Sequence, residues 1–243
     1  MAGAGKKTFT AGETLTASDV NTYLMEQSVM YFGGTAARAS AIPTPSTGMT
    51  SYIGVTGTAT IPQIETYTGS AWQTPYGLTL VGQASFSAVG NVVFNNVFTS
   101  AYENYKLIIE ITNASAGNLV AVRMRSGGTD NSSTNYNGQI SQRTTNNASW
   151  TLYAGASSTY MECFNTNAGV GGSGYVDIFG PATSAYTTFL GYGMQRSSSV
   201  STGLLAAYNT STMSVTTAYD GFNIFPLSGT LTGTIRVYGY RNS

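Results

Sequence analysis

Histidine is absent from this sequence of 243 residues, and cysteine occurs once, as Cys163. Without histidine the chain lacks the usual general base, the partner that activates serine or cysteine nucleophiles, and the commonest transition-metal ligand. One cysteine can form no intrachain disulfide and, without histidine, no structural zinc site. We therefore expect no cofactor and no bound metal, and we interpret Cys163 as a buried structural thiol.

Carboxyl chemistry is the one catalytic route that these absences leave open. Glycoside hydrolysis needs only two acids held across a bond, and the chain has ten acidic residues. No sequence pattern links any two of them. We therefore assign no catalytic residue and expect that the protein is not an enzyme.

Charge is scarce as well. Charged residues make up 8% of the chain, against roughly 25% in an average globular protein, and ten basic residues balance ten acidic ones. The charges are scattered, whereas a phosphate-binding surface needs clustered Lys and Arg. No stretch approaches the ~20 apolar residues of a membrane span. We expect no nucleic-acid partner and no membrane insertion, and low charge favours a permanently assembled protein.

The residues that replace the charges are Gly, Ser, Thr, Asn and Tyr, which favour strands and turns over helices. From residue 78 onward, strand-length segments alternate with turns at the spacing of a sandwich. We predict a C-terminal antiparallel β-sandwich, jelly-roll-like, over residues 78–243. The predicted strands cover 80–89, 92–98, 105–112, 119–125, 138–142, 150–154, 159–165, 174–179, 186–194, 203–208, 213–218, 221–225 and 231–240.

The first 34 residues contain a helix signal. Thr16 is followed three residues later by Asp19, as in an N-terminal capping box, and Val20, Leu24 and Tyr31 lie at helical spacing before Gly33. This pattern predicts a short helix of roughly four turns that ends at the glycine pair 33–34. Such a helix buries too little surface to fold alone, so it must pack on its own C-terminal domain, on sister chains or on a larger particle.

Residues 35–77 differ from both flanks. Pro43 and Pro45 favour an extended entry, and short β-type segments around 48–53 and 61–67 precede a turn that returns the chain at Trp72. We predict a small β-hairpin module here. The predicted division is therefore 1–34, an anchoring leader and helix; 35–77, the hairpin module; and 78–243, the head.

Three segments resemble a known family. The leader FTAGETLTASDVNTYL at 9–24 resembles the opening of many minor structural proteins of tailed bacteriophages. The segment 36–72, with Pro43, Gly48, Tyr67 and Trp72, is similar to a β module that follows that leader. The closing segment GTLTGTIRVYGY at 229–240 is similar to the last strand of phage fibre heads.

The resemblance implies a homotrimeric fibre or spike that is located in the virion, where its N-terminal part binds other proteins of the tail, neck or capsid. The side chains that we expect to carry virion anchoring or trimerisation are Phe9, Leu15, Val20, Tyr23, Leu24 and Tyr31.

Three functions follow as hypotheses. In the first, a tail or neck fibre contributes to host attachment, and its head binds a host cell-surface glycan. Aromatic residues among Asn and Ser suit sugar stacking; the candidates are Trp150, Tyr153 and Tyr160, and also Tyr192, Tyr208 and Tyr219. In the second, the protein is a head fibre or capsid decoration protein without essential receptor binding. The third, a secreted carbohydrate-binding or glycan-degrading protein, is weakened by the missing histidine and by the lack of an apolar run after Lys6 and Lys7.

Overall fold

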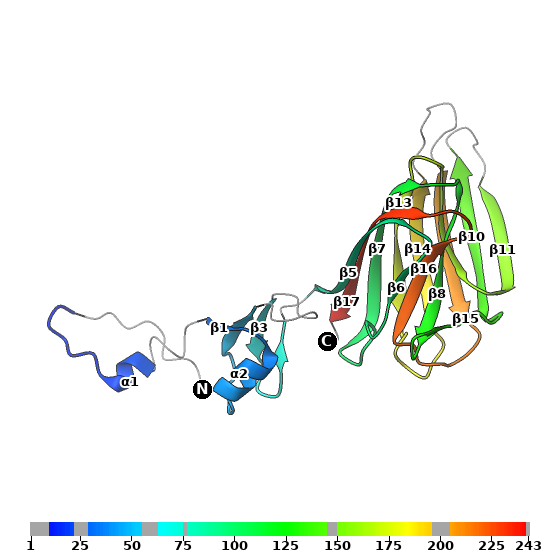
Figure 1. Ribbon diagram of the computed structural model, residues 1–243. Helices are drawn as coiled ribbons and strands as arrows, with labels where there is room; N and C mark the ends of the chain where they lie inside the picture. The colour runs from blue at the N-terminus through cyan, green and yellow to red at the C-terminus, as the bar shows by residue number, and fades with distance from the viewer. Residues whose placement is uncertain are drawn as a thin grey trace. The chain divides into compact units, whose positions relative to one another are not determined.

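The computed structural model describes residues 10–21, 29–54, 63–74, 77–144, 150–195 and 205–241. The chain is mainly β with several sheets and two short helices, and it divides into two compact units, Met1–Tyr76 and Gly77–Ser243 (Figure 1). No helix among the described residues is long and apolar enough to cross a membrane.

The first helix begins where the sequence predicted. In α1 (Ala17–Asp19), the Thr16 hydroxyl accepts a hydrogen bond from the Asp19 backbone N–H at 3.1 Å, and the Asp19 carboxylate accepts one from the Thr16 N–H at 3.2 Å. These bonds satisfy donors that a helix start leaves unpaired. The predicted course of the helix beyond Asn21 falls partly on residues 22–28, outside the described residues.

The predicted helix end is wrong. Strand β1 (Met30–Phe32) replaces the last helical turn and pairs in parallel with β2 (Thr50–Ile53). Tyr31 lies opposite Tyr52 in this pair, and their rings stack with centroids 5.9 Å apart. Pairing with a strand whose residues lie 21 positions further along the chain therefore outweighs the helical spacing of the apolar residues, because aromatic cross-strand pairs stabilise sheets.

The segment predicted as a hairpin module contains antiparallel strand pairs and also a helix that the sequence analysis missed. Strand β2 pairs antiparallel with β3 (Gln63–Tyr67), and β3 pairs with β4 (Trp72–Gln73), so the sheet order is β1-β2-β3-β4. Helix α2 (Thr35–Ala41) has the sequence TAARASA, whose alanines favour helix. The extended entry that the prolines predicted starts only after this helix.

A buried ion pair links α2 to its sheet. The Arg38 guanidinium donates hydrogen bonds to the Glu65 carboxylate and to the Ser51 hydroxyl, and lies 4.3 Å from the centre of the Trp72 ring. Both charged side chains are more than nine-tenths buried. The paired charge and its cation–π contact connect α2 to β2, β3 and β4 of the sheet.

The second unit contains two sheets whose strand pairs, within the described residues, are all antiparallel. An eight-stranded sheet has the order β11-β10-β15-β14-β13-β7-β17-β5, and a smaller sheet has the order β12-β8-β16-β6, with β9 beside β8 (Figure 1). The strands are β5 (Leu78–Val89), β6 (Val92–Phe94), β7 (Tyr102–Ala114), β8 (Asn118–Ser126), β9 (Thr129–Asp130), β10 (Tyr136–Thr144), β11 (Thr151–Ser158), β12 (Met161–Thr166), β13 (Gly172–Phe179), β14 (Thr188–Gln195), β15 (Leu205–Met213), β16 (Gly221–Pro226) and β17 (Leu231–Arg241).

The core lies between the two sheets. On β7 every second side chain is buried, from Tyr105 to Ile111, and Val120, Val122 and Met124 of β8 contribute from the smaller sheet. Each fully buried large apolar side chain contributes about 1.5–3 kcal/mol. Cys163 is buried in this core, as predicted, and burial raises the pKa of its thiol well above the ordinary range.

All but one of the strands predicted in this unit are present. The exception is 213–218, where β15 ends at Met213 and the chain crosses from the larger sheet to β16 of the smaller one. The apolar and β-branched residues of this crossover suggest a strand, but among the described residues it pairs with no other strand. Its Tyr219 is buried in the core instead, with its backbone N–H bonded to the Pro181 carbonyl oxygen.

The unequal sizes of the sheets create an overhang. Strand β12 is the edge of the smaller sheet and packs over β14 and β15: the Phe164 side chain lies against Gly193, and the Asn209 amide donates to the Cys163 carbonyl oxygen at 2.6 Å. The larger sheet continues beyond this edge with β10 and β11. The candidate site lies at this step between the sheets.

Candidate functional site

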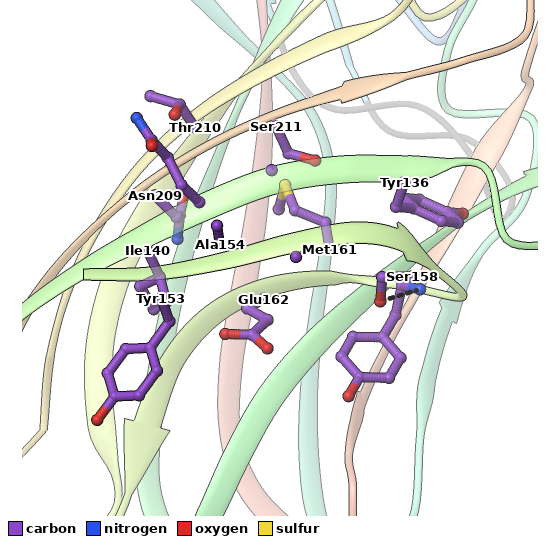
Figure 2. Close-up of a pocket in the computed structure, with 14 residues that line it drawn as sticks. Tyr136, Ile140, Tyr153, Ala154, Ser158, Met161, Glu162, Asn209, Thr210 and Ser211 are labelled. Atoms are coloured by element: carbon purple, nitrogen blue, oxygen red, sulfur yellow. Dashed lines mark hydrogen bonds between the residues drawn. The ribbon is translucent and has the colours of Figure 1, made fainter.

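A cavity of about 90 Å³ opens beside the edge strand β12, below the overhanging strands (Figure 2). We call it the edge groove. Its walls come from β10, β11, β12 and β15 and from the turn before β12. The residues that line it are Tyr136, Gly138, Gln139, Ile140, Tyr153, Ala154, Gly155, Ser158, Tyr160, Met161, Glu162, Asn209, Thr210 and Ser211.

Small residues keep the groove open. Gly138 lies opposite Gly155, and a Cβ atom at Gly138 would be 2.7 Å from the Thr210 carbonyl oxygen and 2.8 Å from the Ser211 Cβ atom. A side chain at this position would therefore force the neighbouring strand to move. Buried Ile140 and Asn209 close the inner end.

Two tyrosines stand in the wall of the groove. Tyr153 lies opposite the buried Ile140 on β10, so it is on the same side of the sheet, and 53% of its side chain area is exposed. Tyr160 is half-buried, and its ring packs edge-on against Phe225 at 6.2 Å. Arg123 holds this turn by donating to the Thr159 carbonyl oxygen at 3.0 Å. Tyr160 is therefore fixed in place, whereas Tyr153 is open to a ligand.

Glu162 supplies the charge of the groove. It is the only charged residue in the lining, and in Figure 2 its carboxylate lies between Tyr153 and Ser158. The side chain is half-buried, and burial raises the pKa of its carboxyl group. Among the described residues, Glu162 makes no hydrogen bond or ion pair. It is thus a partly desolvated acceptor whose hydrogen-bonding capacity is left for a ligand or water.

The structure separates the predicted sugar-stacking residues into groups. Tyr153 and Tyr160 line the edge groove together. Trp150 packs against Tyr208 with centroids 5.8 Å apart, and Tyr208 packs against Tyr192, on the opposite face of the larger sheet. Tyr219 is buried and cannot reach a ligand.

The sequence analysis did not identify Glu162, although one signal was present. The strand Met161–Thr166 reads MECFNT, in which an acid is flanked by apolar residues that prove to be buried. A carboxylate in such a segment needs either a partner or a route to solvent. The edge position of β12 provides that route.

The predicted anchoring residues lie in the first unit or outside the described residues. Leu15 is exposed, Val20 is half-buried after α1, and Tyr31 projects from β1 onto Tyr52. Phe9, Tyr23 and Leu24 are outside the described residues. The structure brings none of the described three together in one cluster.

The described lining of the groove contains a single carboxyl group. Two-acid hydrolysis needs a second carboxyl group roughly 5–10 Å from the first, and Glu162 is the only acid that lines the groove. Within the described part of the chain, no group of three Cys, Asp or Glu side chains is arranged to hold a metal ion.

Comparison with known proteins adds no further restriction: no protein-family model, curated protein or solved structure matches this chain. The chemistry of the groove and the leader motif are therefore the two grounds for a functional proposal.

Proposed function

We propose that the chain is a bacteriophage virion structural protein, a short homotrimeric tail or neck fibre or spike whose jelly-roll-like head binds a host-surface glycan in the edge groove. The resemblance of residues 9–24 to phage leaders supports the virion assignment. The described part of the leader leaves Leu15 and Tyr31 largely exposed, as expected for side chains that other chains cover.

The observation that carries glycan binding is the state of Glu162. A half-buried carboxylate that has no hydrogen-bond or ion-pair partner among the described residues, placed beside two tyrosines, can accept hydrogen bonds from the hydroxyl groups of a sugar. The tyrosine rings offer apolar faces for the C–H side of the same sugar.

The lining also favours one class of sugar. It contains no Lys or Arg, so a carboxylate or sulfate on the sugar would meet Glu162 without a compensating cation. We therefore propose a neutral sugar or an amino sugar. The cavity is smaller than the roughly 300–1,000 Å³ of typical small-molecule sites, so a single sugar unit enters while the rest of the glycan lies on the surface.

A glycan array with the full chain tests the proposal, followed by titration calorimetry on the glycans that bind. We expect binding to neutral or amino sugars, lost in Tyr153→Ala and kept in Tyr208→Ala, because these tyrosines are equally exposed but lie on opposite faces of the larger sheet. Persistent silence on the array would favour the capsid decoration hypothesis. Selective binding of acidic glycans would contradict the assignment of the groove.

A further inference from the structure

A row of aromatic rings crosses the face of the larger sheet that points away from the smaller one. Tyr175, Tyr192 and Tyr208 are direct neighbours on β13, β14 and β15. Their ring centroids are 6.3 and 4.8 Å apart, and Trp150 continues the row 5.8 Å beyond Tyr208. We call this surface the aromatic face.

Aliphatic side chains widen the aromatic face. Leu190 and Met194 flank Tyr192 on β14. The residues that alternate with these three, Gly191 and Gly193, are buried on the core side of the strand. Leu152 lies opposite Ser141, which itself lies opposite Tyr208. Large side chains of this face are between 37% and 61% exposed; they are Trp150, Leu152, Tyr175, Leu190, Met194 and Tyr208.

The exposed area is large for a surface that stays in water. With about 200 Å² for each fully exposed large side chain, these six leave roughly 500–600 Å² of apolar surface in contact with solvent. This is at the upper end of the patches found on monomeric proteins. It approaches the ~800 Å² that each partner buries in a stable protein interface.

The charges around the face suit a copy of the same chain. Strands β11, β14 and β15 contain no charged residue, and β10 contributes one, Arg143, on the same side of the sheet as Ser141. The nearest charged pair, Lys106 with Asp177, is internally neutralised at 2.8 Å, with the Lys106 ammonium 4.2 Å from the centre of the Tyr175 ring. The whole chain has a formal net charge of zero, so copies do not repel each other.

We propose that a second copy of this chain packs on the aromatic face, which is therefore an interface between the heads of the assembled protein. A sugar platform fits less well, because the rings are tilted by 39°, 58° and 52° to their neighbours and share no plane on which sugars could stack. The inference rests on the proposed trimer for the number of copies, and it is independent of glycan binding in the edge groove.

Site-specific photo-crosslinking in the full chain tests this proposal, because it reports on one surface even if the N-terminal unit also joins the copies. Benzoylphenylalanine replaces Tyr208 in one variant and Tyr153 in the other; these residues are 51% and 53% exposed on opposite faces. We expect covalent products between chains from position 208, with the linked peptide inside residues 77–243, and few or none from position 153.

A second pair of variants checks that the product reports a specific interface. Leu190 and Leu227 are 45% and 44% exposed, and only Leu190 is on the aromatic face. Leu190→Lys should reduce the product from position 208 at least tenfold, whereas Leu227→Lys should leave it unchanged. Leu227→Lys should keep the wild-type melting temperature, and both variants should keep the strand signal in circular dichroism, because each replaced side chain is at the surface of the single chain.

Two results would overturn the inference. If light scattering shows a trimer but position 208 gives no product between chains, the heads do not meet at this face, and the proposed function stands. If position 208 crosslinks equally well with Leu190→Lys and with wild-type Leu190, contact there is not specific. Loss of glycan binding alone leaves the inference untouched, because the groove is on the other face.

Discussion

Replacing Glu162 with Gln should stabilise the protein and at the same time weaken glycan binding. Gln is nearly isosteric and removes the charge from a half-buried site that has no partner among the described residues. Full burial of an unsatisfied polar group costs about 1–3 kcal/mol, and partial contact with water reduces this. We expect a gain of about 1 kcal/mol in unfolding free energy at pH 7, or about 2–4 °C in melting temperature.

The gain should depend on pH in a defined direction. Burial raises the pKa of Glu162, so the folded chain holds this proton more tightly than the unfolded chain, in which the pKa is about 4.3. The tighter proton binding of the folded chain contributes fully to the unfolding free energy below the pKa of the unfolded chain. This contribution is lost as the pH rises through the pKa of Glu162 in the folded chain. The difference in melting temperature between Glu162→Gln and the wild type should therefore be smallest below about pH 4 and should increase as the pH rises through the raised pKa of Glu162 in the folded chain.

Binding should change in the opposite sense. Losing one hydrogen bond to a charged acceptor costs about 1.5–3 kcal/mol, which is roughly a 10- to 150-fold loss of affinity in calorimetry. Glu110→Gln is the control, because Glu110 lies on β7, away from the groove. A Glu162→Gln variant that melts below the wild type at pH 7, or that binds glycan with unchanged affinity, would refute the reasoning.

Three further predictions concern the fold and the anchoring role. Arg38→Met should destabilise the first unit by about 3–5 kcal/mol, because it leaves the buried Glu65 carboxylate without its cation, and adding Glu65→Leu should restore most of the loss in chemical denaturation. Gly193→Ala should lower the unfolding free energy of the second unit by about 1–3 kcal/mol, since its Cβ atom would be 2.3 Å from the Phe164 Cβ atom; an unchanged denaturation midpoint would contradict this packing. Deleting residues 1–76 should leave a second unit with its strand signal in circular dichroism but absent from purified particles, and incorporation of the truncated chain would contradict the anchoring role.

Local patterns were enough to predict most strands of the second unit. On β7 and β17 apolar residues recur with a period of two, and such a segment has one face that must be buried whatever its neighbours are. The start of α1 was equally predictable, because the bonds between Thr16 and Asp19 join residues three positions apart.

The edge groove and the aromatic face were decided by strand order and register, which join residues far apart in the chain. Tyr153 reaches the groove because it lies opposite Ile140, and Glu162 reaches it because β12 ends the smaller sheet. Met30–Phe32 became a strand for the same reason, through pairing with Ser51–Ile53. The sequence by itself determined which segments form strands, since that follows from each residue and its near neighbours. Only the tertiary structure decided which of these segments lie side by side, because many alternative pairings bury the same apolar side chains.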